Sequence, residues 1–273
     1  MLEDILVVIK GGGDLATGVA HRLHRAGMRV MVTELAQPTV IRRAVAVASA
    51  VFEGQMEVEG LVARLVESDE GIRAALAEGQ VPVIIDPCAE VINRLHPTVV
   101  VDAIMAKRNT GTAITDAPVV IGLGPGFTAG VDVHAVIETN RGHHLGRVIL
   151  SGSAEPHTGV PGPTAGFTAE RVLRAPCEGT LIMGKRRIGD PVEAGEAVAS
   201  VAGQPVAANI SGVLRGLLAD GLPVKAGMKV GDVDPRGVRE HCFTISDKAR
   251  AIGGGVLEAI LYLLRTSPNT TSD

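Results

Sequence analysis

The stretch that decides the fold is Lys10-Gly11-Gly12-Gly13-Asp14-Leu15-Ala16-Thr17-Gly18. It follows the β-branched run Ile5–Ile9 and leads into the amphipathic segment Leu15–Arg25, so its spacing matches G-x-G-x-x-A between a strand and a helix. Glycines allow a tight turn and the close approach of a phosphate, which the N–H groups at a helix N-terminus then bind. The alternative is a turn that is glycine-rich only for helix packing. The candidate ligand-binding residues of this turn are Gly11, Gly13, Asp14, Thr17 and Gly18.

Short β-branched runs alternate with amphipathic segments through the first hundred residues, which is typical of βαβ units and a mainly parallel sheet. Further strands are predicted at Arg29–Thr33, Val81–Ile85 and Thr98–Val101, and further helices at Val40–Val51 and Ser68–Glu78. We therefore predict a Rossmann-like α/β domain with a doubly wound sheet.

Three of the predicted strands are followed by a carboxylate: Glu34, Asp86 and Asp102. Ligands of open α/β sheets bind outside the carboxyl ends of the strands, so a crevice is expected there. Glu34 is placed to accept a hydrogen bond from a ribose hydroxyl. Its charge favours NAD over NADP unless Arg42 or Arg43 folds back to meet a 2′-phosphate.

From Pro118 to Gly152 shorter apolar runs predict added strands at Val119–Leu123, Val131–Glu138 and Gly146–Leu150. A period of two along the second of these puts Asp132, His134 and Glu138 on one face. Such a face can hold a metal or transfer protons, but a solvated edge strand has the same pattern and is the favoured interpretation. We predict no metal site.

A second glycine-rich loop, Gly122 to Gly130, is able to turn backbone N–H groups toward an anion. The alternative is a sharp chain reversal. Charge for the same crevice would come from Lys107 and Arg108, and from Arg236 and Lys248 in the densely charged segment Asp234–Arg250. The expected members of this composite anion site are Lys107, Arg108, Gly124, Gly126, Arg236 and Lys248.

A repeat with a period of about 32 residues follows a Pro- and Gly-rich linker that begins at Gly159. It pairs Ala175-Pro-Cys-Glu-Gly with Ala208-Asn-Ile-Ser-Gly, and each half is too small to bury a core alone. The segment Ser246–Leu264 predicts a closing helix, whose Gly253-Gly254-Gly255 would let another backbone or a ligand approach.

We expect four parts along the chain. They are a Rossmann-like nucleotide-binding domain over 1–166, a small all-β module over 167–235, a segment over 236–265 whose helix packs back on the first domain, and a mobile tail over 266–273.

Composition narrows the class of protein. With 46% hydrophobic and 21% charged residues among 273, the chain must fold, and a net charge of −4 with only five aromatic residues argues against nucleic-acid binding. Three widely spaced cysteines form no disulfide scaffold. The acidic start Met1-Leu-Glu-Asp is unlike a signal peptide, and no uncharged stretch suits a membrane span. The cytoplasm is the expected location.

The motifs Gly11–Gly18, Asp102–Asn109, Gly122–Gly130 and Asp234–Gly255 together resemble the YqeB family of selenium-dependent molybdenum hydroxylase system proteins. The resemblance runs from Ile9 to Leu261. It implies a cytoplasmic accessory protein whose partners are a molybdenum hydroxylase or its maturation proteins. It names a pathway, and it implies no reaction.

The repeat is also similar to the two halves of biotinyl and lipoyl domains, which are barrel-sandwich hybrids. In those carriers a modified lysine lies in the hairpin between the halves. Here Ser200–Asn209 contains no lysine, and neither Lys185 nor Lys225 matches the hairpin position. We therefore expect the fold of these domains without covalent biotin or lipoate.

Three functions remain open. The leading one is an accessory protein that binds a nucleotide-type ligand, either a dinucleotide such as NAD or a pterin-type molybdenum cofactor, in the crevice. The second is an NAD-dependent oxidoreductase with Asp102 or His134 as the acid–base group. The third is a pure interaction module with an empty crevice.

Overall fold

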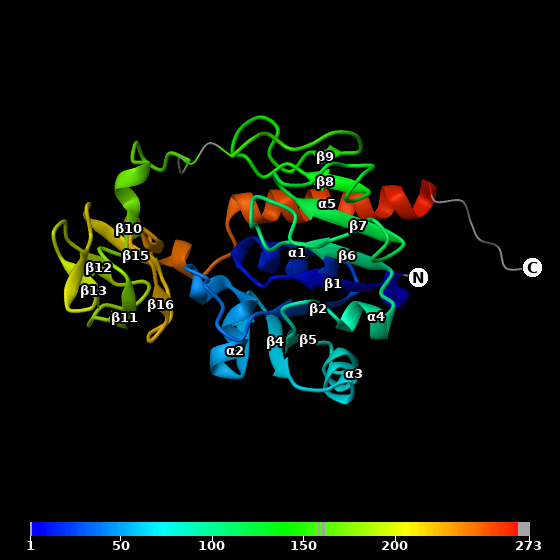
Figure 1. Ribbon diagram of the computed structural model, residues 1–273, viewed down its shortest axis with the longest axis horizontal. Coiled ribbons are helices and arrows are strands. Elements are labelled where there is room, and N and C mark those ends of the chain that lie inside the picture. The colour runs from blue at the N-terminus through cyan, green and yellow to red at the C-terminus, as the bar shows by residue number, and fades with distance from the viewer. Residues whose placement is uncertain (1, 158, 160–161, 267–273) are drawn as a thin grey trace, which may run out of the picture.

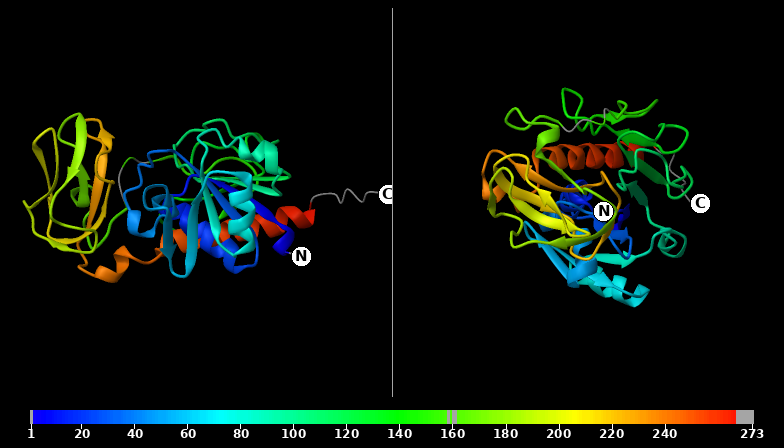
Figure 2. Two further views of the ribbon diagram at one scale, coloured as in Figure 1. Left: turned by 90° about the horizontal axis from the view of Figure 1, so that it is seen from below. Right: turned by 60° about the vertical axis from the view of Figure 1, so that its left-hand side comes forward.

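The computed structural model describes residues 2–157, 159 and 162–266. A large mixed α/β body carries a small β module at one end (Figures 1 and 2). The predicted linker from Gly159 falls partly outside the described residues. So does the predicted tail, except for Thr266, which ends the last helix.

The body is built on a nine-stranded sheet in the order β3-β4-β5-β2-β1-β6-β7-β8-β9. Its strands are β1 (Leu6–Lys10), β2 (Arg29–Glu34), β3 (Gln55–Val58), β4 (Leu61–Val66), β5 (Val81–Ile85), β6 (Val99–Asp102), β7 (Val119–Leu123), β8 (Ala135–Ile137) and β9 (Val148–Ile149). Only the two edge strands, β3 and β9, pair antiparallel. After β1 the chain builds one half of the sheet and then returns to β6 on the other side of β1. The predicted mainly parallel sheet is confirmed, with its topological switch point between β1 and β6.

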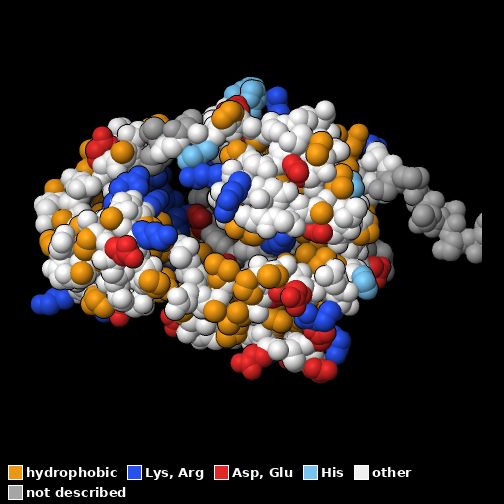
Figure 3. All heavy atoms as spheres, viewed as in Figure 1, with side chains coloured by type: hydrophobic (Ala, Val, Ile, Leu, Met, Phe, Trp, Pro, Cys, Tyr) orange, Lys and Arg blue, Asp and Glu red, His pale blue; other side chains and the backbone are white. Residues whose placement is uncertain are grey.

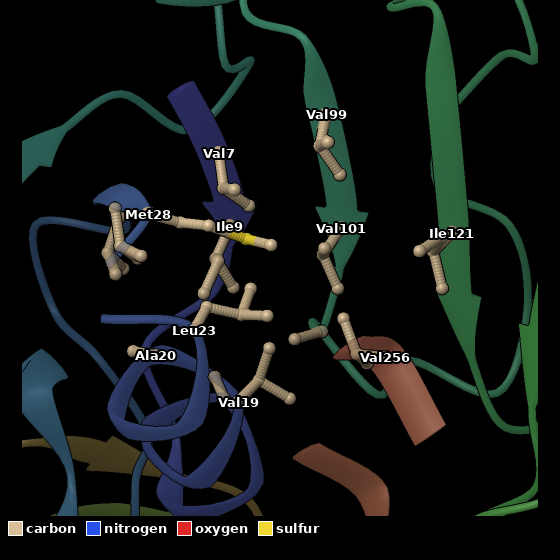
Figure 4. Packing of buried hydrophobic residues seen from close by; sticks show 14 of the residues in the cluster. Val7, Ile9, Val19, Ala20, Leu23, Met28, Val99, Val101, Ile121 and Val256 are labelled. Atoms are coloured by element: carbon tan, nitrogen blue, oxygen red, sulfur yellow. The ribbon is translucent and has the colours of Figure 1, made fainter. Parts of the chain in front are cut away.

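Helices cover both faces of this sheet. One face packs α1 (Asp14–Arg25) and α5 (Asp247–Thr266), and the other packs α3 (Asp69–Ala77) and α4 (Val91–Leu95). Side chains alternate along a strand, so Val7 and Ile9 of β1 meet Leu23 of α1 while Val8 belongs to the opposite core (Figure 4). Both layers of the core are thus formed by near-continuous aliphatic strands.

The closing helix packs on the body through glycines. At Gly18 of α1 a Cβ would stand 2.7 Å from Ala249, and at Gly253 of α5 it would stand 2.7 Å from the carbonyl oxygen of Gly18. Gly255 makes a similarly close approach to Gly146. The predicted close approach of another backbone at these glycines is confirmed. No helix in the described ranges has the length and apolar character needed to span a membrane.

The β module consists of two four-stranded antiparallel sheets, β10-β17-β15-β12 and β14-β13-β11-β16. Its strands are β10 (Val172–Arg174), β11 (Gly179–Met183), β12 (Pro191–Val192), β13 (Ala197–Val201), β14 (Gln204–Ala207), β15 (Gly212–Leu217), β16 (Pro223–Val224) and β17 (Lys229–Asp234). The two halves of the repeat bury one core between them, as predicted. The hairpin β13–β14 turns at Ala202 and Gly203, so no lysine stands at its tip.

The prediction of a helix over Val40–Val51 is wrong. The segment forms the 3-10 turns η2 (Arg43–Val45) and η3 (Val47–Ser49) and then the short helix α2 (Ala50–Glu53). Its N–H groups bond to the glycine turn and α1: Val47 donates to Thr17 Oγ1 at 3.0 Å, and Ala48 donates to the carbonyl oxygen of Gly12 at 2.9 Å. In this segment, hydrogen bonds to distant residues take the place of the hydrogen bonds that a helix would form within itself. The hairpin of β3 and β4, which follows, was not predicted.

The prediction of one strand over Val131–Glu138 is also wrong, because β8 covers only its last part and lies between β7 and β9. Asp132 accepts a backbone N–H in a turn, and His134 Nδ1 accepts the N–H of Val120 at 3.0 Å. Glu138 is buried. The solvated edge face is therefore not formed. Within the described residues no group of three or more His, Cys, Asp or Glu side chains is arranged to hold a metal ion.

Candidate functional site

A cavity of about 1130 Å³ opens at the carboxyl edge of the large sheet and extends to the β module. Lys and Arg side chains gather around this hollow in Figure 3. Nine Lys or Arg and six Asp or Glu line it among the described residues. The cavity thus lies at the switch point of the sheet, where open α/β sheets bind ligands, and its lining is cation-rich.

The glycine turn forms one side of the cavity. Gly11 donates its N–H to Thr33 O (2.8 Å), and Gly12 donates to Glu34 Oε2 (2.7 Å). The other oxygen of Glu34 accepts the N–H of Leu35 at 2.8 Å. Burial raises the pKa of Glu34, and these two hydrogen bonds oppose the shift. The protein's own carboxylate therefore already occupies one of the N–H groups of this turn.

The N-terminus of α1 faces the cavity with Asp14 as its first residue. Arg42 Nη1 lies 3.2 Å from Asp14 Oδ2, and Arg42 Nη2 donates to the carbonyl oxygen of His241 at 2.9 Å. An α-helix leaves its first N–H groups without intrahelical acceptors, so this end can still bind an anion. The negative charge of Asp14 weakens anion binding at this helix end, and the positive charge of Arg42 offsets it.

A buried chain of hydrogen bonds connects Lys10, in the cavity lining, with Asp102. Lys10 Nζ donates to Thr112 Oγ1 at 2.6 Å, and that hydroxyl donates to Asp102 Oδ2 at 2.6 Å. Lys10 and Asp102 are both buried, with Nζ and Oδ2 3.9 Å apart. Lys10 lines the cavity, so its ammonium is a fixed donor there. Lys10 was not among the residues predicted for the site, although it ends the strand before the glycines.

The opposite wall comes from the β module and the segment that follows it. Arg171 Nη1 contacts both oxygens of Asp232 at 2.6 and 2.7 Å. Asp234 is fully buried and receives Arg236 Nη2 at 2.6 Å and Arg215 Nη1 at 3.3 Å. The residues of this wall are Arg171, Arg215, Lys229, Asp232 and Arg236, with Asp234 behind them, and we call them the module wall.

Two lysines of the site have lowered pKa values. Burial lowers the pKa of Lys229 on β17 and of Lys248 on α5. The nearby charge of Asp232 acts against the pKa shift of Lys229, and that of Asp14 acts against both shifts. Neither ammonium has a hydrogen-bonding partner among the described residues. These two groups are therefore the most readily available donors for an anion near the N-terminus of α1.

An apolar surface lies beside this charge. Leu35 and Ile104, which follow the ends of β2 and β6, are 47% and 41% exposed. Both line the cavity, together with Pro87 and Met105. A flat ring system fits such a surface, because apolar side chains dominate the lining of most small-molecule sites.

The structure brings together about half of the residues predicted for the site. Lining the cavity are Gly11, Gly13, Asp14, Glu34, Lys107, Arg236 and Lys248. Outside the lining are Thr17, Gly18, Asp102, Arg108, Gly124, Gly126 and His134. The second glycine loop reaches the cavity only through Pro125, and Gly126 leaves room for the backbone of Arg108, which would lie 2.7 Å from a Cβ.

Three cations of the module wall were not predicted from the sequence: Arg171, Arg215 and Lys229. None of the residues predicted for the site lies in the β module over 167–235. The available signal was the position of these cations relative to the repeat: Arg171 precedes its first half, Arg215 lies within its second half, and Lys229 follows it.

Comparison with known proteins found one strong similarity. No protein-family model matches the chain. The chain is 51% identical over 268 residues to "Uncharacterized protein YqeB" of Escherichia coli (strain K12). The aligned region covers 98% of this chain and 49% of that protein. Among solved structures, the apo structure of the Ectoine utilization protein EutE (DoeB) from Ruegeria pomeroyi has 12% identity and a TM-score of 0.24, over 83% of this chain and 85% of that one. The chain is therefore a homologue of YqeB and spans about half the length of that protein.

Proposed function

We propose that the chain binds a nucleotide-type ligand in the cavity and serves as an accessory protein in the maturation of selenium-dependent molybdenum hydroxylases. The observation that carries the binding proposal is the position of the cavity. It joins a glycine turn and the N-terminus of α1 to an apolar surface at Leu35 and Ile104 and to a cation-rich wall. A nucleotide has both a flat ring and phosphates, so it matches both halves of this lining.

The ligand class includes NAD and a pterin-type molybdenum cofactor. The maturation role, with a molybdenum hydroxylase or its maturation proteins as partners, rests on the sequence resemblance alone. The oxidoreductase alternative gains no support from the placement of its acid–base candidates. Asp102 is bonded to Thr112 behind the cavity, and His134 lies outside the lining.

The glycine turn gives a direct test. A Cβ at Gly13 would meet only Val40 Cγ1, at 3.9 Å, and Gly13 has a φ of −64°, which any residue adopts. Gly13→Val should therefore keep the fold but block a phosphate from the turn. We expect calorimetry with ADP and NAD to show binding to the wild type and at least about tenfold weaker binding to the variant, a change of about 1.4 kcal/mol.

The matched control is Gly254→Ala on α5, where no atom lies within 4 Å of the new Cβ. It should bind as the wild type does. A native mass spectrum of the purified chain would identify a ligand carried from the cell. If the wild type binds no nucleotide in either experiment, the proposal is wrong. Equal affinity of the Gly13→Val variant would place the ligand away from the turn.

A further inference from the structure

We propose that the module wall is the phosphate-binding side of the site and that the ligand carries a diphosphate, held by Arg215 and Lys229 opposite the N-terminus of α1. This inference rests on the proposed function and deepens it, since it assigns a binding role to the β module and narrows the ligand to one with at least two phosphoryl groups.

The first support is a local excess of positive charge. Arg171 is matched by Asp232, and Arg42 by Asp14. Arg215 and Arg236 share a single carboxylate, Asp234. Lys229 and Lys248 have no carboxylate of their own within salt-bridge distance among the described residues. Among these six cations, three positive charges thus have no carboxylate of their own, and burying unmatched charge is unfavourable. A polyanion would offset it.

The second support is the way the module presents Arg215. The pairing of β15 with β17 shifts between Leu214 and Gly216, so Arg215 is the extra residue of a β-bulge. Leu214 and Leu217 stay in the module core while the bulge redirects the arginine to the cavity. Bulges re-aim side chains at the cost of regular pairing, and they are frequent beside binding sites.

The third support is the contact that holds β15 against the body. The N–H of Leu217 donates to the carbonyl oxygen of Ile41 at 2.9 Å, and Arg43 Nε donates to Leu217 O at 2.7 Å. Gly216 leaves the space that Ile41 fills, since a Cβ there would lie 2.7 Å from the Ile41 carbonyl oxygen. The module wall is therefore fixed in position relative to the glycine turn, as a preorganised binding surface requires.

The last support comes from the glycine turn. Glu34 occupies the N–H of Gly12, and Asp14 adds a negative charge at the first residue of α1. This side of the cavity alone attracts a phosphate less than an unoccupied turn would. The module wall across the cavity supplies positive charge that this side lacks.

The experiment compares phosphate probes on the full chain by calorimetry: ADP, AMP, adenosine and inorganic pyrophosphate. We expect ADP and pyrophosphate to bind, and AMP to bind at least about tenfold more weakly than ADP. Lys229→Met and Arg215→Met should each weaken ADP binding by about tenfold or more, and Lys229→Arg should retain it. Arg215→Met leaves Asp234 paired with Arg236, so no buried carboxylate is orphaned.

The matched control is Lys225→Met, which removes an exposed lysine of the same module outside the cavity lining. It should bind ADP as the wild type does. Unchanged ADP affinity in both Lys229→Met and Arg215→Met, alongside a loss in Gly13→Val, would overturn this inference and leave the proposed function standing. Pyrophosphate binding that depends on Lys229, without any nucleotide binding, would support the module wall and refute the nucleotide.

Discussion

At the residue scale, the hydroxyl of Thr112 is the only link of hydrogen-bond length between the buried ammonium of Lys10 and the carboxylate of Asp102 in the described structure. Thr112→Val has nearly the same shape but removes that link. We expect it to lower the free energy of unfolding by about 1–3 kcal/mol, because two buried charged groups lose a hydrogen bond each. Urea denaturation would measure the change.

Thr112→Ser is the matched control for this prediction. It keeps the hydroxyl and removes one methyl group, so it should retain most of the stability that the valine variant loses. Equal losses in the two variants would mean that the packing of the methyl group, and not the relay from Lys10 to Asp102, stabilises this part of the fold.

At the scale of elements, α1 and α5 cross at glycines with no space for a side chain. Gly18→Ala would place a Cβ 2.7 Å from the backbone of Ala249, where nothing flexible can yield. Overpacking of this kind costs about 1–3 kcal/mol, and we expect a corresponding drop in the thermal midpoint. Gly254→Ala, one residue from the contact at Gly253, should instead be neutral or stabilising by up to about 1 kcal/mol.

Thermal unfolding of both variants would decide whether the spacing at the helix crossing or helix propensity dominates. A Gly18→Ala protein as stable as the wild type would show that the two helices can separate without loss.

The elements that sequence could predict are those whose pattern is local. The βαβ alternation, the strand before the glycine turn and the helix beginning near Ser246 all follow from periodicity and capping, and Ser246 Oγ does accept the N–H of Ala249. Val40–Val51 could not be predicted in the same way. Its helical composition is overridden by hydrogen bonds to Gly12 and Thr17, which only the folded chain brings near.

The residues of the candidate site also differ in whether a local sequence pattern predicts them. Gly13, Glu34 and Lys107 were predictable because they lie at or after strand ends that meet at one edge of the sheet. Arg215 was not, because its direction depends on a register shift between β15 and β17 that no local pattern encodes. The sequence of the first domain therefore predicts only the part of the cavity lining that the large sheet provides.

At the scale of the whole molecule, the site is shared among the glycine turn, the module wall and the start of α5. Lys229 and Lys248 reach it from different parts of the chain, and burial lowers the pKa of each. A bound anion favours the charged ammonium. Binding should therefore take up protons near the lowered pKa values, and affinity should fall as the pH rises through them.

Calorimetry of ADP binding in buffers of different ionisation enthalpy would count these protons. The ligand's own titration contributes to the total, so the informative quantity is the difference between the wild type and Lys229→Met. The variant should take up fewer protons and lose less affinity at high pH. Identical proton uptake in the two proteins would exclude Lys229 as a titrating partner of the ligand.

The pairing of α1 with α5 also dictates an order of events during synthesis. Between these two helices the ribosome must make the rest of the parallel sheet and then the entire β module. Because α5 supplies Ile252, Val256 and Ile260 to the core under β1 and β6, a nascent chain that ends before α5 exposes that aliphatic surface. The β module can bury its own core before α5 is made. The module is translated after most of the α/β body, yet it is the first of the two parts that can complete its folding.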